Sequence, residues 1–296
     1  MHGLPLSLKC SLPALAIVTI CGTVCPTADF SELRFIDPDP ATGTSTAVAV
    51  PPGFALAHTG IILPVNRDDE VVNEGDAAGQ AARVLANANW ALAAAGTGRE
   101  YTVMLNVYAA NEAALAAARG RVAEAFPGPT HPAATWTIGE QPRASVLVSM
   151  DCVAVAPLRA PDRVTRFLSH QLPRPYASAH VAVMPPGEVL HLVEPIGDGA
   201  SLAAVGEAAD RLRRRLEEHG LTAEHVVQVR ASIKSMAEAN GIWKQIAAAL
   251  GRELAPPTVI VPQQASAPRP ASVEVIAVRP GARGEDAEAT IYPPSR

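Results

Sequence analysis

The chain has 296 residues, a net charge of -5 from 24 Lys+Arg against 29 Asp+Glu, and a hydrophobic fraction of 48% with an aromatic fraction of only 4%. This apolar content excludes a disordered chain, and the acidic balance with few rings for base stacking argues against a nucleic-acid binder. No apolar run reaches the ~18 residues of a membrane-spanning helix, and the length predicts about two domains.

Residues 1–28 differ in composition from the rest of the chain. Lys9 is the only Lys, Arg, Asp or Glu before Asp29, and a largely apolar stretch runs from Cys10 to Cys25. A basic start followed by an apolar run resembles a secretory signal, although no small-residue cleavage site follows. The alternatives are an additional amino-terminal strand and a misassigned start. Because no cleavage site follows the apolar stretch, the cytoplasm is the favoured compartment, and export through this segment is the alternative.

The cysteines indicate neither a zinc site nor a disulfide framework in the body of the chain. Cys21 and Cys25 form a C-x3-C pair without the second Cys or His pair that zinc requires. Cys152 lies in an apolar alternation, which is typical of a buried core thiol.

The first half predicts two strands around a Pro-Pro-Gly turn, then a helix, a strand, a second helix and two further strands. Gly96 ends the first helix as a C′ glycine does, and Asn111 has the side chain of an N-cap for the second. The expected elements cover residues 46–50, 54–59, 79–95, 101–108, 111–126, 135–139 and 145–155.

The second half repeats this order. Gly220 follows Gly96 by 124 residues, and Val227 follows Val103 by the same 124. Repetition at the length of one domain indicates duplication. In each half, an antiparallel sheet can bury one face under two helices and leave the other apolar face open. The expected elements cover residues 178–183, 188–193, 201–219, 225–232, 236–250, 257–261 and 272–278.

Several motifs of the first half resemble the reactive-intermediate deaminase (RidA/YjgF) family. AHTGIILP, residues 57–64, stands where the family has an S/T-G-Q-x-P turn, with Ile61 in place of the glutamine. AGQAARVLANANWALAAAG, residues 78–96, matches the family's helix pattern Q-x6-N through Gln80 and Asn87. HPAATWTI and LVSMDCVAV stand where the family has its P-A-R-S/T segment and its closing strand.

The second half matches the same passages in a more diverged form, through LEEHGLTAEHVVQVRASI, MAEANGIWKQIAAAL and SVEVIAVRP. The resemblance implies an α+β fold with two tandem RidA/YjgF-like (chorismate-mutase-like) β-β-α-β-α-β-β domains. The implied division is a signal or additional segment over 1–28, domain 1 over 29–157, a linker over 158–175, domain 2 over 176–280 and a tail over 281–296.

The resemblance also implies a chemistry whose usual residues this chain lacks. Members of the family form trimers with sites between subunits and hydrolyse imines and enamines. An arginine clamps the substrate carboxylate, a task that needs a bidentate guanidinium, and a closing-strand glutamate positions water. The arginine position is Ala134 in the first half and Pro257 in the second. The glutamate position is Ser149 in the first half and Ser272 in the second.

Candidate replacements gather near the family's site. Asp151 and Glu274 keep the second acidic position of the closing strand, and Arg119 lies close to the helix asparagine of the family. Glu194 replaces the family's turn glycine, where a carboxylate can act as an acid or base. The expected catalytic residues are Glu194, Asp151 and Arg119. The expected substrate-binding residues are His58, Thr59, Gly60, His131, Thr135, Tyr176, Asn240 and Glu274.

Three functions are consistent with these residues. The first is a divergent RidA-like hydrolase or tautomer-handling enzyme for a small imine or enamine metabolite at a domain interface, needing no metal and no organic cofactor. The second is a catalytically silent binding or assembly protein. The third is a two-domain relative similar to the chorismatases, although the arginines that a dicarboxylate would need are missing.

The expected partners are a small metabolite and further copies of the chain, in a trimeric or pseudo-trimeric assembly. The basic run RLRRRLEEHG spreads around a helix and is followed by Glu217 and Glu218. This pattern is typical of a solvated helix face with local ion pairs. We therefore expect neither a nucleic-acid partner nor a membrane.

Overall fold

A computed structural model describes residues 32–175, 179–197, 201–233, 235–251, 256–262, 271–281 and 290–292. The segment 1–28 and the candidate residue Tyr176 lie outside these residues. Within the described residues, no helix is long and apolar enough to cross a membrane.

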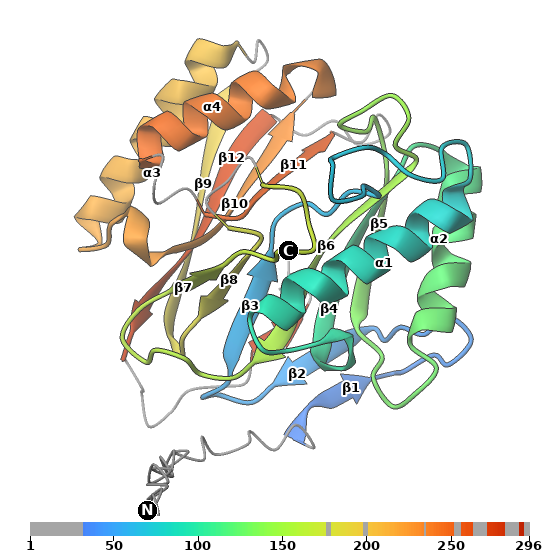
Figure 1. The fold of residues 1–296 in the computed structure, drawn as a ribbon. Helices are drawn as coiled ribbons and strands as arrows, with labels where there is room; N and C mark the ends of the chain where they lie inside the picture. Colours follow the sequence, from blue (N-terminus) through green and yellow to red (C-terminus); the bar gives the residue numbers. More distant parts are fainter. Residues whose placement is uncertain are drawn as a thin grey trace, which may run out of the picture.

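The elements follow the predicted order in both halves (Figure 1). The first half contains β1 (Arg34–Ile36), β2 (Ala47–Val50), β3 (Ala55–Thr59), α1 (Ala77–Ala94), β4 (Thr102–Ala109), α2 (Glu112–Ala125), β5 (Ala133–Ile138) and β6 (Val148–Ala156). The second half contains β7 (Thr165–Phe167), β8 (Val181–Met184), β9 (Gly187–Gly197), α3 (Leu202–Glu218), β10 (Val226–Ile233), α4 (Ala239–Leu250), β11 (Thr258–Pro262), β12 (Ala271–Pro280) and β13 (Thr290–Tyr292).

Local sequence explains where the long helices begin. The side chains of Asp76, Asn111 and Ser201 accept hydrogen bonds from the first turns of α1, α2 and α3, respectively. Gly96 and Gly220 follow α1 and α3 with φ of 81° and 69°, a left-handed conformation that favours glycine. The helix ends are therefore encoded by the residues that the sequence singles out.

The sheets connect the two halves more closely than a simple tandem arrangement would. The six-stranded sheet has the order β5-β4-β6-β3-β8-β7, and the four-stranded sheet has the order β11-β10-β12-β9. The first predicted strand of the second half, β8, thus pairs with β3 of the first half, whereas β9 pairs with β12. The two strands around the second Pro-Pro-Gly sequence consequently belong to different sheets.

Three short strands were not expected from the sequence. β1, β7 and β13 have three residues each, too few for an alternating pattern to be recognised. β7 falls within the expected linker and extends the six-stranded sheet. β13 falls within the expected tail and pairs with β2.

The sheet faces that the sequence leaves open pack against one another. One buried cluster combines side chains of both large sheets and of β2. Its members include Val48, Leu56, Val153, Val155, Met184, Val227 and Val278. The two halves therefore share a core, as expected for single-layer sheets that each need a partner.

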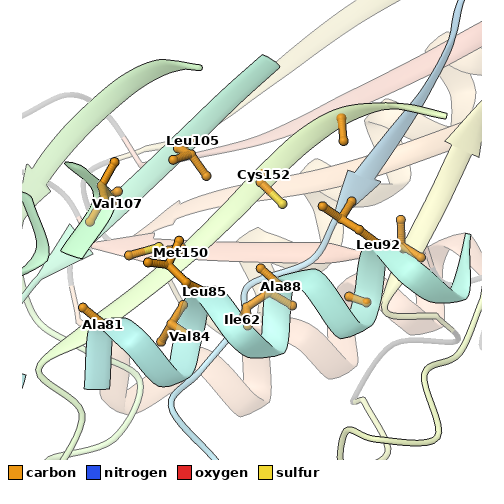
Figure 2. Close-up of a cluster of buried hydrophobic side chains, with 14 of the residues drawn as sticks. Ile62, Ala81, Val84, Leu85, Ala88, Leu92, Leu105, Val107, Met150 and Cys152 are labelled. Atoms are coloured by element: carbon orange, nitrogen blue, oxygen red, sulfur yellow. The ribbon is translucent and has the colours of Figure 1, made fainter. Parts of the chain in front are cut away.

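The other face of the six-stranded sheet is covered by α1 and α2. Figure 2 shows the side chains of α1 lying over those of β4 and β6. The labelled residues include Ala81, Val84, Leu85, Ala88, Leu92, Leu105, Val107, Met150 and Cys152. Alanines on the buried side of α1 allow a close approach of helix and sheet, which explains how an alanine-rich, ring-poor chain forms its core.

The close approach at Ala91 gives a first prediction. Ala91 is fully buried in this core, whereas Ala93 on the same helix is exposed. Ala91→Leu should lower the free energy of unfolding by about 1–3 kcal/mol because a packed core has no room for the added carbons. Ala93→Leu should change it by less than about 0.5 kcal/mol. Urea denaturation followed by circular dichroism measures both; equal effects would contradict the packing described here.

Candidate functional site

A buried polar cluster lies on the face of β6 that points away from the helices. Alternation places Val148, Met150 and Cys152 against α1 and leaves Asp151 on the opposite face. The Asp151 carboxylate accepts hydrogen bonds from Asn106 Nδ2 at 2.8 Å and from the Tyr108 hydroxyl at 2.7 Å.

Thr135 extends the cluster to β5. Its hydroxyl donates to Asn106 Oδ1 at 2.6 Å, and this bond orients the amide group so that its nitrogen faces Asp151. β5 is also the strand that carries Ala134, at the position of the family's arginine. Ala134 packs against the helix-covered core, so its side chain lies on the face of β5 opposite to Thr135 and the cluster.

The second domain contributes an arginine to this cluster. Arg230 of β10 donates from Nη1 to the Tyr108 hydroxyl at 2.6 Å and from Nη2 to Asp151 Oδ2 at 3.2 Å. The Asp151 side chain is 1% exposed and that of Arg230 is 25% exposed. Because an isolated buried carboxylate is very costly, the guanidinium from across the interface is needed to neutralise it.

Tyr108 stays protonated within this cluster. Burial raises the pKa of Tyr108 well above its ordinary value, against the opposing effect of Arg230. Its hydroxyl can therefore donate to Asp151 while it accepts from Arg230. The ring also packs with Val259 and Ile61, so the tyrosine connects the first domain to β11 of the second.

Glu274 lies beside Arg230 on the same face of the four-stranded sheet. The two residues are directly opposite in the antiparallel pairing of β10 and β12. Val273 and Val275 point into the helix-covered core, so Glu274 points to the face that carries Arg230. Ser272 Oγ donates to Glu274 Oε1 at 3.4 Å. A cation and a carboxylate thus stand side by side at the edge of the interdomain core.

Glu194, expected as an acid or base, lies on the opposite face of that sheet. It forms ion pairs with Arg211 at 3.0 Å and Arg215 at 2.8 Å, both on α3. Burial acts to raise the pKa of Glu194, but the hydrogen bonds from the two arginines outweigh burial and the pKa lies below its ordinary value. These ion pairs account for two arginines of the basic run on α3. Glu194 lies on the helix-covered face of the sheet, whereas Arg230 and Glu274 lie on the other face.

Arg119 and His131 are also separate from the cluster. The Arg119 guanidinium lies 5.3 Å from the centroid of the Trp136 ring and is exposed on α2. The ring of His131 is buried, and its Nδ1 has no hydrogen-bond partner within the described residues. The backbone carbonyl of His131 accepts from Ser45 Oγ at 2.6 Å. Of the three expected catalytic residues, only Asp151 belongs to the interdomain cluster.

The segment of His58, Thr59 and Gly60 forms part of the contact between domains. The backbone carbonyl of Thr59 accepts from Gln228 Nε2 at 2.6 Å. The side-chain hydroxyl of Thr59 accepts from the backbone amide of Cys152 at 2.9 Å. Gly60 N donates to the carbonyl of His180 at 3.0 Å. Burial raises the pKa of the Cys152 thiol to about 12, so this cysteine is an inert core group.

A cavity of about 280 Å³ opens between the domains. Its wall is formed by residues 60–65 after β3, by Asn87 of α1, by residues 172–175, and by α4 and β11 of the second domain. Of the candidate residues, Gly60 and Asn240 line it. The described residues contain no group of three or more His, Cys, Asp or Glu side chains that could hold a metal ion.

Sequence reasoning missed Arg230 and Tyr108 as site residues. A signal for Arg230 was present, because Gln228, Arg230 and Ser232 alternate with apolar residues along VVQVRASI. Such alternation marks a polar face of the strand. It does not reveal that this face meets Asp151, because the interface depends on contacts between residues 79 positions apart.

Comparisons with known proteins find similarity to the first half of the chain. Residues 37–156 match the sequence model of the family described as Endoribonuclease L-PSP. A Rid-family protein from Yersinia pestis is 26% identical, with 42% of this chain and 98% of that chain covered and a TM-score of 0.38. A YjgF-family protein from Neisseria meningitidis is 22% identical, covering 42% of this chain and 95% of that chain with a TM-score of 0.31. No curated protein sequence matches the chain.

The fold therefore defines a tandem RidA/YjgF-like α+β protein with its polar cluster at the domain interface. Its first half is similar to the family described as Endoribonuclease L-PSP, whose sequence model matches residues 37–156. The second domain repeats the element order of the first.

His58 gives a prediction for the pH dependence of stability. It is buried, neither ring nitrogen has a hydrogen-bond partner in the described part of the chain, and burial lowers its pKa to about 3, helped by the charges of His191 and Arg230. The unfolded chain binds a proton at this residue below about pH 6.5, whereas the native state does not until about pH 3. The stability contributed by neutral His58 is therefore complete above pH 6.5 and falls as the pH decreases.

We expect the step from pH 7 to pH 5 to cost the wild type about 2 kcal/mol more than His58→Leu, which cannot titrate. Urea denaturation at the two pH values measures the difference. Parallel losses in the two proteins would show that His58 is protonated in the native state.

Proposed function

We propose that the chain is a divergent RidA-like enzyme that acts on a small imine or enamine metabolite at the interface between its two domains. The observation that carries this proposal is the arginine of the second domain that reaches the acidic closing strand of the first. In hydrolysis, water adds across the C=N bond, ammonia leaves and a carbonyl forms. This reaction needs no metal and no organic cofactor.

Arg230 is the proposed binding group for the substrate carboxylate. The family's own arginine position is Ala134, which cannot bind an anion, but Arg230 is joined to that strand by the hydrogen-bond chain through Asp151, Asn106 and Thr135. The hydrogen bonds of Arg230 to Tyr108 and Asp151 come from Nη1 and Nη2, and a guanidinium has five N–H donors. Because its side chain is 25% exposed, donors remain within reach of a ligand.

Glu274 is the proposed group that positions the attacking water. It is the neighbour of Arg230 across the strand pair, so a substrate held by the guanidinium lies within reach of the carboxylate. Asp151 is enclosed by three donors and serves as the residue that positions Arg230. Thr135 supports the same chain of bonds.

The assembly of the enzyme is part of the proposal. Val189 and Val193 of β9 are 36% and 49% exposed, and alternation places them on the face of the sheet that carries Glu274. Exposed apolar side chains on such a face support self-association, in a trimeric or pseudo-trimeric arrangement. The division into domain 1 over residues 29–157 and domain 2 over residues 176–280 is likewise a prediction.

A catalytically silent binding protein is the second candidate. Ser149, at the position of the family's glutamate, is buried and donates to Gln141 Oε1 at 2.8 Å. The charge of Arg230 is balanced by Asp151 of the protein itself. Both features favour a protein that binds without turnover.

An imine-hydrolysis assay tests the enzyme. Imines generated by an amino-acid oxidase are supplied to the purified protein, and the release of ammonia and keto acid is followed. Wild type should accelerate imine decay. Arg230→Lys keeps the positive charge but loses the two-point contact, and should reduce kcat/KM roughly 10- to 100-fold. Glu274→Gln should reduce kcat by about 100-fold.

The matched control is Glu217→Gln, an exposed carboxylate on α3 whose ion pair among the described residues is with Arg213 of the same helix. It should retain wild-type kinetics, and circular dichroism verifies that all variants are folded. If wild type gives no acceleration, the enzyme proposal fails and the binding protein is favoured.

A further inference from the structure

A short segment that follows β7 covers one side of the interdomain cavity. We call residues 169–175 the strap, and its residues 172–175 line the cavity. His180 lies directly before β8, is 7% exposed and lines the same cavity. The contacts between the strap and His180 therefore decide whether this side of the cavity is covered.

The imidazole ring of His180 is bound to the strap at both nitrogens. The backbone N–H of Ser169 donates to Nδ1, with the two nitrogens 3.0 Å apart. Nε2 lies 2.9 Å from the carbonyl oxygen of Pro173, which can only accept. The ring consequently carries its proton on Nε2, and the neutral form of this tautomer satisfies both hydrogen bonds.

The backbone of His180 is anchored to the first domain. Its N–H donates to the carbonyl of Phe167 at 3.0 Å, and its carbonyl accepts from Gly60 N at 3.0 Å. The histidine is thus fixed to β7 and to the turn after β3, and its ring in turn holds the strap.

The strap has few other contacts that hold it in place. Leu172 is its apolar anchor, 8% exposed and part of the core under α1. Within the strap, Leu172 N donates to the Ser169 carbonyl and Gln171 N to Ser169 Oγ, both at 3.4 Å, which is long for a hydrogen bond. His170, Gln171 and Arg174 are exposed. Because such a segment opens at a low free-energy cost, the two ring bonds of His180 matter for its closure.

Protonation of His180 is incompatible with the closed strap. An imidazolium donates from both nitrogens, so Nδ1–H would face the N–H of Ser169 and that buried amide would lose its acceptor. Burial lowers the pKa of His180, against the opposing effect of its bond to Pro173. In an open, solvated strap the histidine titrates near pH 6.5. The free energy that favours closure is therefore complete above about pH 6.5 and decreases as the pH falls.

The charged groups around His180 do not favour its protonation. Asp69 and Arg143 line the cavity and neutralise each other, with Arg143 Nη2 and Asp69 Oδ1 2.7 Å apart. Arg174 is the remaining charged residue of the described lining, and α4 and β11 contribute uncharged side chains to it. Arg166 of β7 donates to three backbone carbonyls of the second domain. His58 on β3, the strand beside β8, stays neutral because burial lowers its pKa to about 3.

We propose that His180 is a pH-sensitive latch, whose neutral ring keeps the strap closed over the cavity and whose protonation below about pH 6.5 releases the strap and opens the cavity to solvent. The latch regulates access to the cavity and does not depend on the chemistry proposed for Arg230 and Glu274.

Hydrogen exchange of the full chain at pH 7 and pH 5 tests the latch, with each amide rate divided by its intrinsic rate at that pH. In wild type, the protection of the Ser169 amide should fall about 3- to 25-fold, as expected when only the open strap titrates near pH 6.5. In His180→Gln the side-chain amide can replace both ring nitrogens but cannot titrate. Its protection should therefore change by less than about twofold. His170→Gln, which changes an exposed histidine of the same strap, should respond as wild type does.

Two further measurements separate the latch from general unfolding. His180→Leu removes both ring bonds, so its Ser169 amide should be weakly protected at pH 7 already. The amide of Cys152, bound to Thr59 Oγ1 in the core, should stay better protected than that of Ser169 at both pH values. An unchanged Ser169 amide in wild type, a pH response that survives His180→Gln, or equal protection of Ser169 and Cys152 at pH 5 would each overturn the proposal. Arg230→Lys should leave the response unchanged, so a failed imine assay does not decide this test.

Discussion

The carboxylate of Asp151 is 1% exposed, and its negative charge is balanced by a guanidinium that belongs to the other domain. A buried ion of this kind is tolerated only when its partner and its remaining hydrogen bonds are held in place. Asn106 and Tyr108 supply those bonds from the neighbouring strand, and Arg230 supplies the charge. The relative placement of the two sheets is thus constrained by a charged contact, in addition to hydrogen bonds such as that from Gln228 to the Thr59 carbonyl and to the shared apolar cluster.

The same contact explains how a duplicated fold can change its chemistry. When both sheets contribute to one interface, a residue lost from one copy can be replaced by a residue of the other without any change in fold. In this chain Arg230 reaches the cluster from β10, whereas Ala134 of β5 packs on the helix-covered face of its strand. The function of such a protein depends on the site and cannot be carried over from the fold alone.

Much of the fold could be predicted from the sequence because its signals are local. Gly96 and Gly220 mark helix ends, Asp151 and Glu274 alternate with apolar residues, and the 124-residue offset reveals the duplication. The location of the site was less predictable because it depends on contacts that no local pattern encodes. Glu194 stands at a position where the family has a turn glycine, which suggested a functional role. In the structure it forms ion pairs with two arginines of α3 and so links the helix to the sheet. Arg230 looked like an ordinary strand residue, yet it crosses the interface.

The pairing of β8 with β3 determines where the chain can be divided into stable fragments. β8 comes after the linker in sequence but lies beside β3 in space, between β3 and β7. A fragment that ends with β6 would expose the backbone donors and acceptors of β3 along an open sheet edge, which is a known route to aggregation and strand swapping. The boundary at which the sequence repeats is therefore not the boundary at which the protein can be cut. The backbone hydrogen bonds between β3 and β8 join the two halves of the sequence in one continuous sheet.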